Sequence, residues 1–313
     1  MGRFAISFRV PRNKISIIWP LLAFFPALVF NQTKTVMDDA GNIFPLAAPP
    51  QRIVSLAPNI TEILFALGLG ESVIGVTRYC DYPPAALQKE KVGGLTDPNI
   101  EKIKSLNPDL VIAFRGNPWN IITRLQAFRL RVFVLDIGNS LDSVPRTIEK
   151  IGQITRRENE AQALLKSLED KYQQVLTVLA PLVRKPKVFF NLHGMDLSTC
   201  GQGSYLDDLL ERAKSVNIAG HIPRQWLVYS REQLIKDNPD VIIIQAKSEA
   251  DFRKAKDWYK TNAGFQTLQA VKTDRIHFID ENISSRFGPR LYDAFAELAR
   301  LIHPELFSGG GIK

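Results

Sequence analysis

The chain has 313 residues, 45% hydrophobic and 23% charged, which indicates a globular protein of about two domains and excludes a disordered chain. Half of its formal net charge of +8 comes from Arg3, Arg9, Arg12 and Lys14. The remainder has no block of Lys and Arg, so we expect no nucleic-acid partner, because such binding needs a clustered basic face.

The N-terminal segment has the order of residues typical of a secretory signal peptide. Basic residues 1–14 precede an apolar run from Ile15 to Phe30. This run is shorter than the roughly 20 residues that span a bilayer, and Pro20 and Pro26 weaken a helix there. We expect residues 1–35 to direct export to the periplasm, either as a cleaved signal peptide or as a retained anchor. No Cys follows the run, which argues against a lipoprotein.

Strands and helices alternate in the next part of the chain, residues 36–139. This alternation implies parallel strand pairing and an N-terminal α/β lobe. The expected strands are 53–56, 73–76, 110–114 and 132–135. One expected helix starts with a capping box formed by Asn59 and Glu62, and others start at Asp97-Pro98 and Trp119.

Residues 140–184 carry apolar side chains at helical spacing and no strand signal. One helix of about 40 residues would be about 60 Å long and would join two lobes as a stiff hinge. The alternative is two shorter helices, broken near Arg156 to Asn159.

A second α/β lobe, residues 185–313, repeats the plan of the first, with strands expected at 188–192, 241–245 and 276–279. The predicted fold class is therefore α/β: two similar lobes with mainly parallel sheets, joined by a single long helix, with a ligand cleft between them.

One sequence pattern occurs twice and supports this duplication. The stretch from Glu101 to Ile112 matches that from Glu232 to Ile243, with Asn-Pro-Asp at the same position in each. Flanking segments match in the same order: 52–54 with 187–189, and 131–136 with 275–280. Two similar lobes form a cleft, where small ligands usually bind. The alternative is chance similarity between two common helix–turn–strand units.

Aromatic residues gather in the loops that follow the expected strands, where open α/β sheets bind their ligands. These residues are Tyr79, Tyr82, Phe114, Trp119, Trp226 and Phe287. They favour a cleft for a large, flat, partly apolar ligand, although each alone is explained equally well by loop packing.

Conventional catalysis has little support in the sequence. No Gly-x-Ser-x-Gly, phosphate loop or His-Glu-x-x-His motif occurs, and the four histidines are scattered. We therefore expect no catalytic residue, no metal site and no cofactor. Of the four histidines, His193, at the end of a strand, is the one candidate axial ligand to a metal carried by the ligand. A secreted two-lobed enzyme remains the rival class, and it would need an acid/base pair or a metal cluster in the cleft.

Each lobe has one glutamate at a matching place in the repeat, and each also has one cysteine. Glu101 and Glu232 each fall in the first turn of a helix. A carboxylate there stabilises the helix by about 0.3–1 kcal/mol, and a pair of them could also dock onto arginines of a partner. Cys80 and Cys200 follow strands and could pair if their Cα atoms approach, or could simply be packed.

The stretch from Gln51 to Gly68 resembles the opening of the periplasmic substrate-binding proteins for iron–siderophores, haem and vitamin B12. Tyr79 to Pro84, Asn107 to Gly116, Ser230 to Gln233 and Pro289-Arg290 look most like the cobalamin-binding branch. The resemblance covers residues 36–305. It implies two lobes joined by one long helix, a monomer, and delivery to the permease and ATPase subunits of an ABC importer. Glu101 and Glu232 match the docking acids of the family.

The resemblance implies cobalamin or a related corrinoid as the ligand, with haem or a ferric siderophore as alternatives. Phe114 and Leu95 stand where the branch typically has Trp, and Arg286 matches an arginine near the cleft. A siderophore site would use Arg78, Arg115 and Arg286, whereas a haem site would use His193, Tyr79 or Cys200. The ligand-binding candidates are Tyr79, Asp81, Phe114, Arg115, Gly116, His193, Cys200, Trp226, Arg286 and Phe287.

Overall fold

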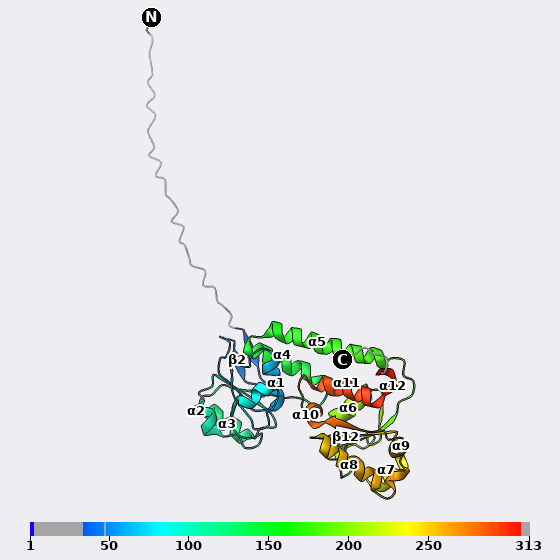
Figure 1. Cartoon of the computed structure of the whole chain (residues 1–313). Helices are drawn as coiled ribbons and strands as arrows, with labels where there is room; N and C mark the ends of the chain where they lie inside the picture. The colour runs from blue at the N-terminus through cyan, green and yellow to red at the C-terminus, as the bar shows by residue number, and fades with distance from the viewer. Residues whose placement is uncertain (3–33, 47, 308–313) are drawn as a thin grey trace. The chain divides into compact units, whose positions relative to one another are not determined.

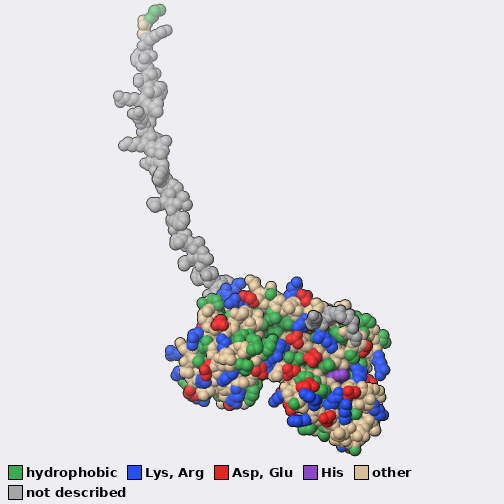
Figure 2. Space-filling view, in the orientation of Figure 1, with side chains coloured by type: hydrophobic (Ala, Val, Ile, Leu, Met, Phe, Trp, Pro, Cys, Tyr) green, Lys and Arg blue, Asp and Glu red, His purple; other side chains and the backbone are tan. Residues whose placement is uncertain are grey.

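The computed structural model describes residues 1–2, 34–46 and 48–307. Nearly all of the expected signal segment, residues 1–35, lies outside these ranges. Among the described residues, no helix is both long enough and apolar enough to cross a membrane. Two sheets form two lobes, which confirms the predicted α/β class and its two-lobed plan. Figure 2 shows a hollow between them.

The N-lobe is built on a parallel sheet in the order β5-β4-β3-β6-β7. Its strands are β3 (Ile53–Ser55), β4 (Val73–Val76), β5 (Glu90–Lys91), β6 (Leu110–Phe114) and β7 (Val132–Leu135). Its helices are α1 (Pro58–Ala66), the 3-10 helix η1 (Pro84–Gln88), α2 (Ile100–Ser105) and α3 (Trp119–Ala127). A hairpin of β1 (Thr35–Met37) and β2 (Ile43–Pro45) precedes them. The expected helix start at Asp97-Pro98 is wrong, because the Asn99 side chain caps α2 by accepting from the amide of Lys102.

The C-lobe sheet has the order β11-β9-β8-β12-β13, with β10 also paired to β8. Its strands are β8 (Lys187–Asn191), β9 (Ser198–Cys200), β10 (Val216–Asn217), β11 (Trp226–Val228), β12 (Val241–Ala246) and β13 (Ile276–Asp280). Its helices are α6 (Tyr205–Arg212), α7 (Arg231–Asp237), α8 (Glu249–Thr261), η2 (Phe265–Thr267), α9 (Gln269–Lys272), α10 (Glu281–Ser284), α11 (Leu291–Ile302) and α12 (Pro304–Phe307). β9 pairs antiparallel with both β8 and β11, whereas the other pairs are parallel.

Two helices, rather than one, connect the lobes, so the expectation of a single 40-residue helix is wrong and the broken alternative is confirmed. α4 (Ser143–Thr155) ends at Arg156, which adopts a left-handed conformation with φ of 60°. α5 (Glu158–Leu179) then packs on α4 and on α11 of the C-lobe, as Figure 1 shows. A Cβ on Gly152 would lie 2.7 Å from that of Ala161, so glycine allows the close approach at this turn.

The repeated Asn-Pro-Asp pattern has the same structural role in both lobes. Asn107 and Asn238 lie within two residues of the ends of α2 and α7, and both have a positive φ, 48° and 46°. The Asp109 carboxylate accepts from the amides of Gln51 and Arg52 at the start of β3, at 2.8 and 3.1 Å. Asp240 likewise accepts from the amide of Lys187 at the start of β8, at 2.9 Å. The matched order β3-β6-β7 and β8-β12-β13 completes the duplication.

One buried cluster of apolar side chains runs continuously from the N-lobe to the C-lobe. It includes Ile112 of β6, Val144 of α4, Leu168 of α5 and Phe295 of α11. Because this core passes through the helical connection, the lobes are joined by packed side chains as well as by the chain itself.

We expect Asp109→Ala to lower the free energy of unfolding by about 1 kcal/mol, because two backbone amides lose their acceptor and water only partly replaces it. Urea denaturation measures this change. Asp170→Ala is the control, since Asp170 is exposed on α5 and has no polar partner among the described residues; it should change stability by less than about 0.5 kcal/mol. Equal stabilities of the two variants would contradict the role given to Asp109.

Candidate ligand-binding site between the lobes

A cavity of about 330 Å³ lies where the carboxyl ends of the N-lobe strands face the segment between α10 and α11. The N-lobe contributes Ala57, Pro58, Asn59, Tyr79, Leu95, Phe114 and Ile137. The C-lobe contributes Glu281, Ser285, Arg286 and Phe287. Four of the predicted site residues, Tyr79, Phe114, Arg286 and Phe287, therefore lie together.

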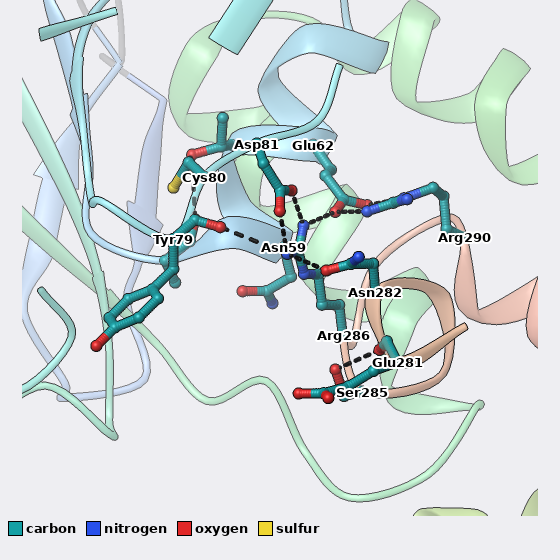
Figure 3. Close-up of polar contacts among 12 residues, drawn as sticks. Asn59, Glu62, Tyr79, Cys80, Asp81, Glu281, Asn282, Ser285, Arg286 and Arg290 are labelled. Carbon is teal, nitrogen blue, oxygen red and sulfur yellow. Dashed lines mark hydrogen bonds and ion pairs between the residues drawn. The ribbon is translucent and has the colours of Figure 1, made fainter. Parts of the chain in front are cut away.

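Tyr79 follows β4 and is half exposed beside the cavity. The Arg78 guanidinium lies 5.7 Å from the centre of its ring, and Arg78 also pairs with Asp97. In Figure 3 the Tyr79 ring extends away from the charged residues around Arg286. Its phenol oxygen has no hydrogen-bond partner among the described residues, so an aromatic face and a free hydroxyl are both offered to a ligand.

Phe114 is placed by the tight turn that follows β6. Its ring lies over Gly116, where a Cβ would come within 2.1 Å of the ring, so glycine is required there. The buried Asn117 side chain accepts from the Phe114 amide at 3.0 Å and donates to the carbonyls of Leu56 and Leu95 at 3.2 and 2.9 Å. Gly116 thus shapes the site through Phe114, and Asn117 fixes three chain segments around the cavity.

Aromatic rings continue from the cavity across the C-lobe. The Phe287 ring packs edge-on against Tyr205, with centroids 4.6 Å apart, and Tyr205 packs against Trp226 at 5.7 Å. Trp226 is half exposed on the edge strand β11 and does not line the cavity itself. Trp226, which the sequence predicted to bind the ligand, therefore reaches the cavity wall through the buried ring of Tyr205.

Charged side chains from both lobes meet beside the cavity, as Figure 3 shows. Glu62 of α1 is only 2% exposed and accepts from Arg290 at 3.0 and 2.6 Å and from Arg286 at 3.2 Å. The Asn59 side chain donates to the Phe287 carbonyl at 3.1 Å. The predicted capping box of Asn59 and Glu62 is wrong: Ala57 is the N-cap of α1, and both polar side chains bind the other lobe instead.

Asp81 belongs to the same cluster and accepts from Arg286 at 2.5 and 2.9 Å. The Arg286 guanidinium hydrogen-bonded to it holds the pKa of Asp81 below the ordinary value for an aspartate. Burial works against the charge of Arg286, but its bonds to Asp81 raise the pKa of Arg286 overall. Both groups stay charged, and the pair fastens the Tyr79 loop to the C-lobe.

His193 lies outside this cavity, in a second one of about 300 Å³ at the ends of β8 and β12. Met195, Lys247 and Lys254 also line that second cavity. Glu281 lines both cavities, so they adjoin.

Arg115 and Cys200 are two further predicted site residues that line neither of these two cavities. Arg115 pairs with Asp136 at 3.3 Å and donates to the Asp39 carbonyl at 2.7 Å. Cys200 is fully buried, and burial raises the pKa of its thiol to about 12, so the prediction that it faces the cleft is wrong. Cys80 is also buried, between the hydroxyls of Thr61 and Thr77, and both cysteines are free.

Glu101 and Glu232 lie in the first turns of α2 and α7, as the repeat predicted. The Glu101 side chain is 79% exposed, with only a distant contact of 3.8 Å to Arg124. Glu232 is exposed and has no partner among the described residues. Each lobe thus presents one carboxylate to solvent at the same place in its fold.

Within the described residues, no group of three or more His, Cys, Asp or Glu side chains could hold a metal ion. Among the site residues that the sequence reasoning missed are Asn59, Glu62, Asn117 and Tyr205. Asn117 follows the Phe-Arg-Gly stretch, and Tyr205 starts α6, but neither position carries a sequence pattern that singles it out.

Comparison with known proteins agrees with this geometry. The profile of the periplasmic binding protein family matches residues 53–283. An ABC transporter substrate-binding lipoprotein of Bacillus subtilis, YvrC, is 32% identical over 278 residues, covering 87% of this chain and 86% of its own. The vitamin B12-binding protein of Pectobacterium atrosepticum is 30% identical and covers 78% of this chain and 85% of its own.

Solved structures show the same two-lobed architecture. The periplasmic haem-binding protein RhuT from Roseiflexus sp. RS-1, in apo form, superposes with a TM-score of 0.73. It is 26% identical in sequence, and the match covers 82% of this chain and 99% of RhuT. The chain belongs to the periplasmic binding protein family, as a non-enzymatic substrate-binding protein of an ABC importer.

Proposed function

We propose that this protein captures cobalamin or a related corrinoid outside the cytoplasm and delivers it to the permease and ATPase subunits of an ABC importer. The observation that carries the proposal is the cavity with aromatic walls from both lobes: Tyr79 and Phe114 on one side and Phe287 on the other. Such walls favour a flat, partly apolar ligand, whose faces they cover. The resemblance to vitamin B12-binding proteins points to the same class of ligand.

The size of the cavity bears on how a corrinoid would fit. Sites for drug-sized ligands span roughly 300–1,000 Å³, and this cavity of about 330 Å³ is at the lower end of that range. A corrinoid is larger than a typical drug, so it would extend along the Tyr205–Trp226 side or into the adjoining cavity near His193.

Ferric siderophores receive less support from the charges around the site. The three candidate arginines are already paired: Arg78 with Asp97, Arg115 with Asp136, and Arg286 with Asp81 and Glu62. A ligand with several negative charges would have to break these pairs to gain a counter-charge.

Haem is the second candidate, and one observation favours it. The free phenol of Tyr79 stands at the cavity wall, where it could become an axial ligand of an iron, and tyrosine is one of the residues that bind haem iron. Haem binding also has a precedent in RhuT.

Export of the chain is part of the proposal. The basic and apolar order of residues 1–30 would carry it across the membrane, as a cleaved signal or as an anchor that keeps the binding protein near its importer. Glu101 and Glu232 would then dock onto arginines of the permease, one carboxylate from each lobe.

Calorimetric titration with cyanocobalamin and, separately, haemin tests the ligand. We expect one cyanocobalamin to bind per chain, and Phe287→Ala to weaken it at least tenfold, about 1.4 kcal/mol, because one wall of the cavity is lost. Trp226→Ala should have a smaller effect, since Trp226 is connected to the cavity only through Tyr205.

Phe128→Ala is the matched control, because Phe128 is a half-exposed aromatic that packs on Lys104, away from the cavity. It should bind as the unmodified protein does. Tight haemin binding without cyanocobalamin binding would keep the importer class and change the ligand. Equal losses in Phe287→Ala and Phe128→Ala would overturn the assignment of the cavity.

Replacing both Glu101 and Glu232 by Ala should leave ligand affinity unchanged, because both lie away from the cavity, and should abolish most uptake. Uptake of radiolabelled ligand is measured in cells that carry the variant as their sole copy of this protein. The control pair, Glu71→Ala with Glu211→Ala, removes one exposed glutamate from each lobe at places that do not match. Normal uptake by the Glu101/Glu232 variant would refute the docking role.

A further inference from the structure

We propose that Arg286 is a positioning residue of the ligand site, which holds the loop from Tyr79 to Asp81 in place and affects the ligand through Tyr79 rather than by touching it. The part that concerns affinity rests on the proposed function, whereas the part that concerns the loop does not. This proposal differs from the expectation that Arg286 itself binds the ligand.

The guanidinium of Arg286 is already committed to the protein. Nη1 donates to Glu62 at 3.2 Å and to Asp81 at 2.5 Å. Nη2 donates to Asp81 at 2.9 Å and to Asn282 at 2.8 Å. The side chain is only 12% exposed. Although Arg286 forms part of the cavity wall, its terminal nitrogens therefore have little capacity left for a ligand.

The same guanidinium ties the N-lobe loop at two points. The two oxygens of Asp81 accept from its two terminal nitrogens, the bidentate arrangement that fixes both distance and orientation. Nη2 also reaches the backbone carbonyl of Tyr79, at 3.4 Å. The Tyr79 side chain is half exposed. The N-lobe holds the next residue, Cys80, whose amide donates to the Thr77 carbonyl at 3.1 Å and whose carbonyl accepts from Lys91 at 3.0 Å. The bonds from Arg286 add a restraint from the C-lobe on Tyr79 and Asp81.

Asp81 and Glu62 offer a way to separate this role from a general effect on folding. Asp81 is 45% exposed, so Asp81→Asn removes the charge at the surface of the cluster. The buried Glu62 keeps both of its bonds to Arg290 in that variant. Arg286→Ala removes the contacts to both carboxylates, and Arg286→Lys restores a charge without the bidentate geometry.

Hydrogen exchange of the ligand-free full chain, followed by mass spectrometry, measures how firmly the loop is held, because a loosened loop exchanges its backbone amides faster. We expect Arg286→Ala and Asp81→Asn to raise exchange in residues 77–82 by about tenfold, and Arg286→Lys to raise it less. Arg115→Ala is the control, since Arg115 also pairs with an aspartate outside the cavity, and it should leave residues 77–82 unchanged. Unchanged exchange in Arg286→Ala and Asp81→Asn overturns the proposal; if Arg286→Ala does not fold, Asp81→Asn decides.

Titration of the same variants with cyanocobalamin and with haemin separates positioning from contact. If Arg286 acts by positioning the loop, we expect ligand binding to be about tenfold weaker in Asp81→Asn as well as in Arg286→Ala. The double variant should lose no further affinity, and Arg286→Lys should bind more tightly than Arg286→Ala. Weaker binding in Arg286→Ala with full affinity in Asp81→Asn would mean that Arg286 contacts the ligand, and would overturn the proposal. If the unmodified protein binds neither probe, the proposed function fails, and the exchange measurement alone decides the role of Arg286.

Discussion

The arrangement of the two lobes depends on the ion pairs that the buried Glu62 carboxylate forms. This carboxylate comes from the N-lobe, yet its partners, Arg286 and Arg290, both come from the C-lobe. A charge this deeply buried costs several kcal/mol when its partner is removed, so the lobes cannot part at this point without a large penalty. The cavity lies directly beside this ion cluster, and its two aromatic walls are held at a defined separation as a result.

The helical connection reinforces the same restraint. α5 packs on α4 and on α11, and one apolar core continues through these helices from lobe to lobe. A site whose walls are held in place before the ligand arrives loses less entropy on binding. The helical connection and the ion cluster therefore favour small movements of the lobes around a largely formed site. A movement of the lobes can break the less buried contacts at lower cost, such as the ion pair between Asp81 and Arg286.

The sequence predicted the features that depend on local chemistry. The two lobes could be inferred because Asp109 and Asp240 cap equivalent strands, which requires the same short motif twice. The break between α4 and α5 was harder, because Arg156 adopts a left-handed conformation without the Gly or Asn that usually marks one. The role of Glu62 could not be predicted, because its arginine partners are 224 and 228 residues away along the chain. The strand β9 that contains Cys200 was not predicted, and burial of this cysteine was only one of the alternatives that the sequence left open.

A crystal structure of the full chain with cyanocobalamin tests the account most directly, because it reports the ligand's place and the state of the ion cluster together. We expect the ring system to lie between the wall formed by Tyr79 and Phe114 and the wall formed by Phe287, with Arg286 still bound to Asp81. A ligand bound outside this cavity, or an Arg286 side chain turned from Asp81 to the ligand, would contradict it.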